Sequence, residues 1–334
     1  MKLLDLEREE SFALLGPGFA DGRFLLLRGL RPACAFEADP LLVFAPFERA
    51  GASPLLFAAA SAAACEPRLA HEPAPGHLEV ELQAPAHSEK VRAIREAIAR
   101  GDVYQVCLTA RARLEGASGA GLLTAMCARG VPRFAAWVRL PGGGELVSAS
   151  PELFFETRGA HVHTEPMKGT ARPDDGGQLA ASEKDRCELA MITDLLRNDL
   201  VPVCRPRSVR VEHERRVIPL PYALQTVSDV VGELTEGATA LDVLAALHPG
   251  GSVTGAPKGA ALAMIRQLEV GPRGAYCGAL GLCRGRLRST FSLLIRTAQR
   301  DEAGWTYGVG GGIVYGSDPD REMDELHVKL GALR

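Results

Sequence analysis

The chain has 334 residues, of which 46% are hydrophobic and 24% charged, and its formal net charge is −3. This composition excludes an intrinsically disordered chain, and the charge balance provides no basic face for nucleic acid. The 36 glycines and 22 prolines predict many turns and strands, in either two domains or one large sheet-rich domain.

The eight cysteines contain no CxxC pair, and the first residues do not resemble a signal peptide. We interpret them as reduced cytosolic thiols and expect a cytoplasmic protein. The longest apolar run, residues 54–65, is shorter than the roughly 20 residues of a membrane span. We interpret it as a buried or alanine-rich helical segment.

The first regular helical pattern follows several short apolar pieces that predict strands, at 24–30 and 40–47. Ser88 is a candidate N-cap, apolar residues follow at helical spacing, and Gly101 predicts the helix end. The next run, 103–114, alternates apolar and polar residues and predicts a half-buried strand.

Further strands are predicted at 134–140, 145–159 and 160–166. A helix begins at Ser182, and residues 278–301 predict a hairpin. No internal repeat or low-complexity linker separates these elements. The pattern predicts one α+β domain with large antiparallel sheets.

Two acidic pairs stand at helical spacing. Asp185 and Glu188 share one face of the helix from Ser182, and Glu322 and Glu325 share a face of a helix near the end of the sequence. Either pair alone is typical of a solvated face near a helix N-terminus. Together with Glu152, they favour a site where carboxylates surround a cation, and oxygen ligands suit Mg²⁺.

Two glycine-rich stretches resemble nucleotide-binding loops without matching them. In 248–261, Pro257 precedes Lys258 and Gly259 follows it, which breaks the phosphate-loop pattern. The stretch 308–314 is followed by a strand-like segment rather than a helix. It favours close approach of the backbone to a ligand instead.

The segment 281–285 resembles the nucleophile elbow of a glutamine amidotransferase, with Cys283 as nucleophile. Only His327 follows it, without the expected acid, so the strand end of a hairpin is the better interpretation. We therefore expect that this chain does not release ammonia from glutamine.

Three basic residues are candidates to face an anionic substrate: Lys168, Arg296 and Lys258. Each is more often a surface charge. Lys168 stands out because it lies in TEPMKGTARP, which has no strand or helix periodicity and predicts a rigid turn. Arginine suits carboxylates through its forked donors.

The ordered segments GDVYQVCLTAR, SASPELFFE, PMKGTARP, DRCELAMITDLLRNDL, HPGGSVTGAPKGAA, LLIRTAQ and GVGGGIVYGSDPDREMDE resemble the chorismate-utilising enzymes. That family includes anthranilate synthase component I, aminodeoxychorismate synthase component I, and isochorismate and salicylate synthases. The resemblance implies an antiparallel two-sheet β-sandwich surrounded by helices. It also implies a catalytic region at 88–334 and a shortened N-terminal region at 1–87 that packs on it, within one structural domain.

The resemblance implies roles for the acids. Glu188 and Glu325 would hold Mg²⁺ with support from Asp185 and Glu322, and Glu152 would be the general acid at the ring hydroxyl. It implies substrate contacts as well. Tyr276, Arg296 and Gly312 would hold the enolpyruvyl carboxylate, and the remaining substrate-binding candidates are Gly311, Ser252, Gln225, Gln105 and Thr170.

Three positions are informative within the family. Isochorismate and salicylate synthases carry lysine at the position of Gln105, and anthranilate synthases carry alanine at that of Lys168 and histidine at that of Gln225. The pattern here is similar to aminodeoxychorismate synthases, in which the lysine is the proposed covalent nucleophile.

The implied reaction is Mg²⁺-dependent amination of chorismate at C4 for folate and para-aminobenzoate biosynthesis. The ammonia would come from a separate glutamine amidotransferase subunit, and neither nucleic acid nor a membrane would be a partner. The alternatives are anthranilate synthase component I, 2-amino-2-deoxyisochorismate synthase, and a non-catalytic anion-binding protein on the same fold.

Overall fold

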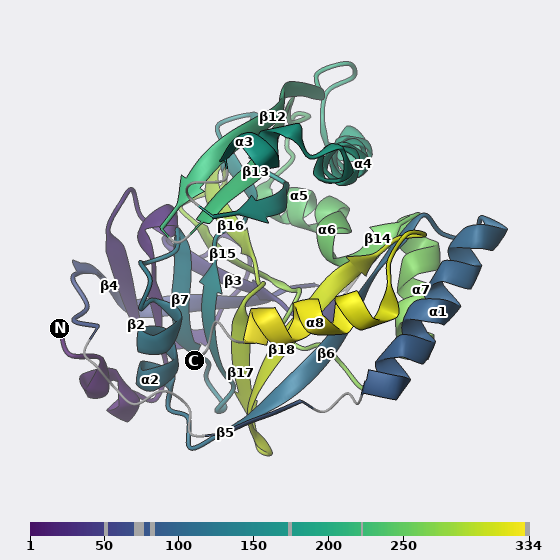
Figure 1. Ribbon diagram of the computed structural model, residues 1–334. Helices are drawn as coiled ribbons and strands as arrows, with labels where there is room; N and C mark the ends of the chain where they lie inside the picture. Colours follow the sequence, from purple (N-terminus) through teal and green to yellow (C-terminus); the bar gives the residue numbers. More distant parts are fainter. Residues whose placement is uncertain (50–52, 70–76, 81–83, 173–175, 222, 331–334) are drawn as a thin grey trace.

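The computed structural model describes residues 1–334 except 50–52, 70–76, 81–83, 173–175, 222 and 331–334. In this part of the chain, eighteen strands join in one continuous network of antiparallel pairs, with helices around it (Figure 1). The strands are β1 (Phe12–Leu15), β2 (Phe24–Pro32), β3 (Leu41–Ala45), β4 (Leu55–Cys65), β5 (His77–Val80), β6 (Gln105–Glu115), β7 (Phe134–Arg139), β8 (Glu145–Ser150), β9 (Leu153–Arg158), β10 (His161–Thr164), β11 (Met167–Ala171), β12 (Arg210–Leu220), β13 (Ala223–Glu233), β14 (Gly255–Ala256), β15 (Ala279–Cys283), β16 (Arg288–Leu293), β17 (Thr297–Asp301) and β18 (Gly304–Ile313). The α-helices are α1 (Ala84–Arg100), α2 (Gly119–Met126), α3 (Gly176–Ala181), α4 (Glu183–Leu200), α5 (Ala240–Leu247), α6 (Gly251–Thr254), α7 (Lys258–Leu268) and α8 (Pro319–Leu330), and the short 3₁₀ helices are Leu3–Arg8, Pro17–Phe19, Phe47–Arg49 and Val201–Val203.

Strand β3 of the network is buried on both faces. In β3, Leu41 and Val43 pack into one apolar core, while Leu42 and Phe44 point into another. The strands of the first 65 residues belong to this network, because β1 pairs with β7 and β3 pairs with β15. No helix in the described ranges is long and apolar enough to cross a membrane.

Two predicted helical features are wrong. Residues 55–65 form strand β4, which pairs with β2 from Phe24↔Cys65 to Pro32↔Phe57. Backbone pairing to neighbouring strands overrides the helix preference of alanine, because intrinsic propensity is a weak signal beside tertiary contacts. The helix expected from Ser88 already begins at Ala84, while Gly101 follows its end with a φ of +83°, as expected.

The other helix, strand and hairpin predictions near the candidate site are confirmed. Ser182 Oγ accepts a hydrogen bond from Asp185 N at 3.3 Å and caps α4. Asp318 Oδ1 accepts from Asp320 N at 3.2 Å in the first turn of α8. Residues 105–115 form β6, and β15 and β16 form the predicted hairpin.

The prediction of a rigid turn at TEPMKGTARP is wrong, because Met167–Ala171 form strand β11, which contains one irregularity. In β11, Lys168 pairs with Thr226 and Thr170 with Gln225 of β13, and the register shifts between the two pairs. Gly169 at the shift has a φ of +72°, a conformation that favours glycine. Pro173, at the end of the motif, lies outside the described residues.

The glycine-rich stretch forms the end of β18, which pairs along its length with β6. Helix α8 lies across these two strands (Figure 1). A Cβ at Gly308 would stand 2.1 Å from Cγ of Tyr276, so glycine lets the tyrosine ring lie on the strand. Backbone glycines therefore make room for side chains at the site.

Candidate active site

Lys168 lies where four separate elements meet. Its Nζ is 4.0 Å from Oε2 of Glu188 on α4, and each of these side chains is 17% exposed. A Cβ at Gly312 on β18 would lie 3.5 Å from Lys168 Nζ and 2.6 Å from Nε2 of Gln105 on β6. The fold thus gathers a lysine, a carboxylate and an amide around one backbone glycine.

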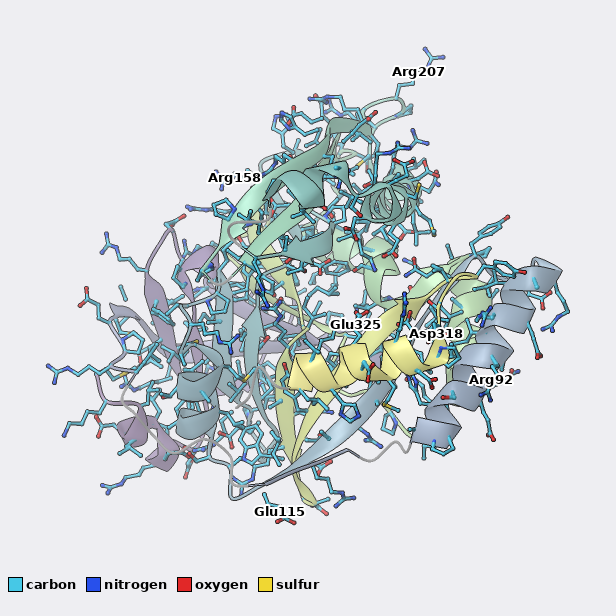
Figure 2. All side chains as sticks on the ribbon, viewed as in Figure 1. Arg92, Glu115, Arg158, Arg207, Asp318 and Glu325 are labelled. Atoms are coloured by element: carbon cyan, nitrogen blue, oxygen red, sulfur yellow. The ribbon has the colours of Figure 1, made fainter. Side chains whose placement is uncertain are left out.

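The remaining three predicted metal ligands border the same region. A Cβ at Gly311 would lie 3.3 Å from Oε2 of Glu322 and 4.0 Å from Oε1 of Glu325. Figure 2 shows Glu325 on α8. On α4, Asp185 lies against β11, since a Cβ at Gly169 would be 2.8 Å from its Cγ.

Lys329 is a neighbour of the acids that our sequence analysis missed. Its Nζ is 2.7 Å from Oε1 of Glu325 and donates a hydrogen bond to the carbonyl of Gly310 at 2.6 Å. The spacing of four residues after Glu325 on a helix was the available signal. Both acidic helices therefore present a carboxylate beside a lysine ammonium group.

Glu152 is a buried acid between β8 and β9. Burial raises the pKa of its carboxyl to about 7, although a hydrogen bond from Ser252 and the charge of Lys168 act in the opposite direction. Ser252 Oγ on α6 donates to Glu152 Oε1 at 3.1 Å. A carboxyl with a pKa near neutrality can hold and release a proton, as a general acid must.

Two glutamines present buried amide atoms without a hydrogen-bond partner in the described part of the chain. They are Oε1 and Nε2 of Gln105 and Oε1 of Gln225. Buried polar atoms are normally paired. These two amides therefore fit contact with a polar ligand, and Thr170, opposite Gln225 in the strand register, is exposed.

Two of the predicted carboxylate-binding residues, Tyr276 and Arg296, belong to the sheet and its connections. Tyr276 is buried, and this burial raises the pKa of its hydroxyl well above the usual value. Arg296 lies between β16 and β17 with a φ of +51°, and its carbonyl accepts a hydrogen bond from Ala149 N at 3.0 Å. This positive φ fixes the direction in which the side chain of Arg296 leaves the sheet.

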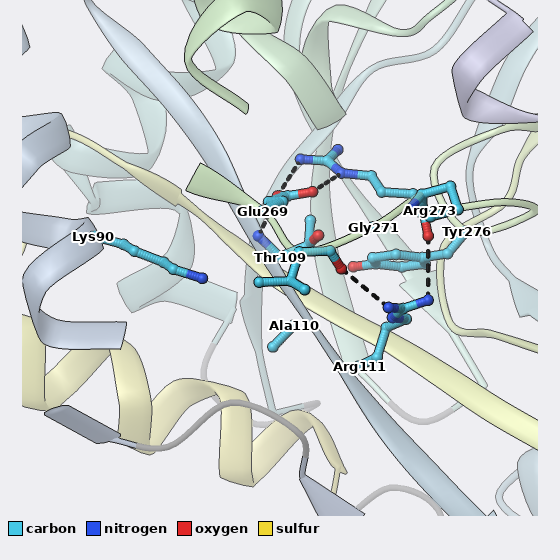
Figure 3. A pocket seen from close by; sticks show the side chains of 10 residues that line it. Lys90, Thr109, Ala110, Arg111, Glu269, Gly271, Arg273 and Tyr276 are labelled. Atoms are coloured by element: carbon cyan, nitrogen blue, oxygen red, sulfur yellow. Dashed lines mark hydrogen bonds and ion pairs between the residues drawn. The ribbon is translucent and has the colours of Figure 1, made fainter. Parts of the chain in front are cut away.

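A small pocket borders Tyr276 (Figure 3). Lys90 extends toward Thr109 from α1, and Arg111 donates to the carbonyls of Val270 at 3.0 Å and Pro272 at 3.4 Å. Arg111 therefore ties the loop before β15 to β6.

Two candidates from the sequence have structural partners instead. Lys258 Nζ is 2.6 Å from Asp199 Oδ2 and donates to the Leu247 carbonyl at 3.1 Å, so its charge is used within the fold. Cys283 is fully buried in β15, and burial raises the pKa of its thiol to about 12. A buried neutral thiol does not suit a nucleophile, which agrees with the hairpin interpretation.

The predicted acids fit a hard divalent cation by their chemistry. They offer only carboxylate oxygens, which are the ligands that such a cation prefers. Lys168 lies beside Glu188 and Lys329 beside Glu325, so both carboxylates already face a positive charge. The compact ligand group found among the described residues is a different one, comprising His163, Glu165 and Asp229 within 4.8 Å. Its two carboxylates are already paired with Arg216, which disfavours a metal there.

Residues 19–334 match the family described as chorismate binding enzyme. The chain belongs to this family. The family assignment confirms the resemblance carried by the sequence motifs, while the roles of individual residues in the chorismate-binding site stay predictions.

Two curated relatives carry different activities in their names. An anthranilate synthase component 1 from Haloarcula marismortui is 37% identical over 255 residues, which are 74% of this chain and 52% of that one. An aminodeoxychorismate synthase from Streptomyces pristinaespiralis is 41% identical over 268 residues, which are 75% of this chain and 37% of that one. The chain therefore spans about half or less of the length of these relatives.

A solved structure confirms the predicted fold class. A putative 2,3-dihydroxybenzoate-specific isochorismate synthase from Bacillus anthracis superposes with a TM-score of 0.79 at 23% identity, covering 98% of this chain and 97% of that one. At this identity the likeness concerns the fold alone. The chain thus has the α+β fold with antiparallel sheets that is shared by the chorismate-binding family.

Proposed function

We propose that the chain is an aminodeoxychorismate synthase component I, which aminates chorismate at C4 with ammonia in a Mg²⁺-dependent reaction. The observation that carries this proposal is the position of Lys168, whose Nζ lies beside Glu188 and the backbone of Gly312. A lysine there can act on a substrate that the acidic residues help to hold. Gln105, on the other side of Gly312, offers a neutral amide rather than a base.

The chain's own residues would bind the substrate at both carboxylates. Tyr276, Arg296 and the backbone of Gly312 would hold the enolpyruvyl carboxylate. Glu188 and Glu325, supported by Asp185 and Glu322, would hold Mg²⁺, which supplies a positive charge for the ring carboxylate. Ser252, Gly311, Thr170 and Gln225 would line the same pocket.

The reaction is then two successive allylic displacements. Lys168 first loses its ammonium proton to solvent. Its amine then forms a bond to C2, the ring double bond shifts, and the C4–O bond breaks. Glu152 gives its proton to the departing hydroxyl, which leaves as water. Ammonia then bonds to C4, the double bond returns, and the C2–N bond to Lys168 breaks.

The proposed reaction differs in two ways from related reactions of chorismate, which add water or eliminate pyruvate. Gln105 cannot act as a base on a water molecule, so addition of water at C2 is disfavoured. No step eliminates pyruvate, so the product keeps its enolpyruvyl group as 4-amino-4-deoxychorismate, a precursor for para-aminobenzoate and folate. The buried Cys283 supports a separate glutamine amidotransferase subunit as the source of ammonia.

Anthranilate synthase component I is the second candidate, because a relative of that name is 37% identical to this chain. Amination at C2, giving 2-amino-2-deoxyisochorismate or anthranilate, would need no covalent lysine. The presence of Lys168 beside Glu188 favours C4 over C2.

Product analysis tests the proposal. The purified protein is incubated with chorismate, Mg²⁺ and ammonium, and the product is identified by mass spectrometry and by NMR, which separates the 2-amino from the 4-amino isomer. We expect 4-amino-4-deoxychorismate that forms only when ammonium is present. Anthranilate with pyruvate, 2-amino-2-deoxyisochorismate or isochorismate as the main product would contradict the proposal.

A further inference from the structure

A buried carboxylate lies three residues before Lys168. Glu165, at the junction of β10 and β11, is 4% exposed. Arg133 Nη1 is 2.5 Å from its Oε1, and Arg216 Nη2 is 2.6 Å from its Oε2. Each carboxylate oxygen thus faces its own guanidinium group, so the buried acid is paired at both oxygens.

Arg216 links Glu165 to a second buried carboxylate. From the edge strand β12, its Nε is 2.6 Å and its Nη2 2.8 Å from the two oxygens of Asp229 on β13. His163 Nε2 on β10 also lies 2.8 Å from Asp229 Oδ1. Although burial acts in the opposite direction, the bonds from Arg216 and His163 lower the pKa of Asp229 to about 2.

These ion pairs fix the segment that carries Lys168. Ser228 N donates to the carbonyl of Pro166 at 3.1 Å, and the hydroxyl of Thr226 donates to the carbonyl of Lys168. Both contacts come from β13, the strand that also holds Asp229. The segment from Glu165 to Lys168 is therefore bonded to β13 at Pro166 and Lys168, and Arg216 connects Glu165 to Asp229 of the same strand.

Glu165 also acts on the proposed acid. The charged groups that act on Glu152 are Lys168, which lowers its pKa, and Glu165, which raises it; the other polar contact is the neutral hydroxyl of Ser252. Glu165 is thus connected to both proposed catalytic groups, to Lys168 through the backbone and to Glu152 through its charge.

We propose that Glu165 is a positioning residue for the amination. Clamped between Arg133 and Arg216, its carboxylate fixes the segment that delivers Lys168 and acts through its charge on Glu152. This inference rests on the proposed function, because it takes Lys168 as nucleophile and Glu152 as acid. It adds a residue that the family motifs quoted above do not single out.

The test is the pH profile of kcat for amination in Glu165→Gln. This substitution keeps the size of the side chain and removes its charge, so the pKa of Glu152 falls and Glu152 loses its proton at lower pH. We expect the alkaline limb of the profile to move to lower pH. A purely structural role would lower kcat without moving this limb.

Two further variants separate charge from placement. Glu165→Asp keeps the charge on a shorter side chain, and we expect a lower kcat with the alkaline limb near its wild-type position. Glu156→Gln is the matched control, because Glu156 on β9 contacts Arg158 and His163 but is not among the charges that act on Glu152. We expect its profile to equal that of the wild type.

Infrared titration of the Glu152 carboxyl, assigned by its disappearance in Glu152→Gln, provides a readout that does not depend on turnover. A lower pKa in Glu165→Gln shows that the charge of Glu165 acts on Glu152 whether or not the protein aminates chorismate, so the absence of amination would refute the proposed function separately. If the wild type aminates chorismate and Glu165→Gln has an unmoved limb and an unmoved Glu152 pKa, the inference is wrong. Should Glu165→Gln not fold, a wild-type kcat in Glu165→Asp would overturn it.

Discussion

Glu152, the proposed general acid, carries a cost in folding stability because its carboxyl is buried. Its pKa of about 7 in the folded protein lies above the usual 4.5, because burial penalises the charged form. Below pH 4.5 both the folded and the unfolded state keep the proton, and no cost arises. Between pH 4.5 and 7 only the unfolded state releases it, so folding becomes less favourable, and above pH 7 the cost is constant at about 3 kcal/mol.

Glu152→Gln should therefore be more stable than the wild type at alkaline pH and inactive in amination. We expect the free energy of unfolding to rise by about 2 kcal/mol at pH 8, since the buried amide retains part of the desolvation cost. The gain should disappear at pH 4. Urea unfolding at the two pH values measures it, and an equal difference at both would show that the carboxyl does not titrate as described.

At the scale of an element, strand β11 contains a register shift directly beside Lys168, and this shift sets the direction of the lysine side chain. Gly169 takes a positive φ between the two register pairs and lies directly against Asp185 of α4. The strand, the helix and the proposed nucleophile thus meet at a position that only glycine fills. The local sequence predicted that a rigid turn holds Lys168. In the structure, the pairing of β11 with β13 holds it instead.

Gly169→Ala should disturb both folding and turnover. The new Cβ would meet Asp185 Cγ at 2.8 Å in a strained backbone conformation, so we expect a loss of about 2 to 3 kcal/mol in the free energy of unfolding. We also expect turnover to fall at least about tenfold, because Lys168 and Asp185 both shift.

The matched control is Gly142→Ala. Gly142 has a φ of +91°, but a Cβ there would have no atom within 4 Å. It should cost about 1 kcal/mol and leave turnover unchanged. Equal turnover in the two variants would mean that the contact with Asp185 does not matter for the site.

At the scale of the whole molecule, the fold joins segments that are far apart in the sequence. The acids come from α4 and α8, the lysine from β11 and the glycines from β18. A cation bound between the two helices would bind the folded chain only, and so would stabilise the whole structure.

Mg²⁺ should accordingly raise the free energy of unfolding, by about 2.7 kcal/mol at 100 times its Kd. Glu325→Gln should remove this effect along with Mg²⁺-dependent turnover. Asp324→Asn, the neighbouring exposed acid on α8, is the control and should respond like the wild type. Thermal melts with and without Mg²⁺ measure the difference, and full stabilisation of Glu325→Gln would place the metal elsewhere.

Much of this arrangement could be predicted from local sequence. The caps of α4 and α8, the alternation of β6 and the acid pairs are signals within a few residues of one another. The order of motifs along the chain indicated the family. Such features depend mainly on residues close in the sequence, which is why they could be predicted.

The remainder depends on contacts between distant segments. The alanine-rich stretch of β4 became a strand because β2 and β3 offer their edges to it. Neither the contact of Lys329 with Gly310 nor the clamp of Arg216 on Glu165 leaves a pattern within one element. Lys258 was a candidate to face an anionic substrate because its contact with Asp199, which lies on another helix, leaves no local pattern.

The most direct test of the central claim compares the products of the wild type and Lys168→Ala by NMR after reaction with chorismate, Mg²⁺ and ¹⁵N-ammonium. If Lys168 directs the amine to C4, the wild type yields ¹⁵N at C4, and the variant loses this product or places ¹⁵N at C2. An unchanged yield of 4-amino-4-deoxychorismate from Lys168→Ala would contradict the covalent role of Lys168.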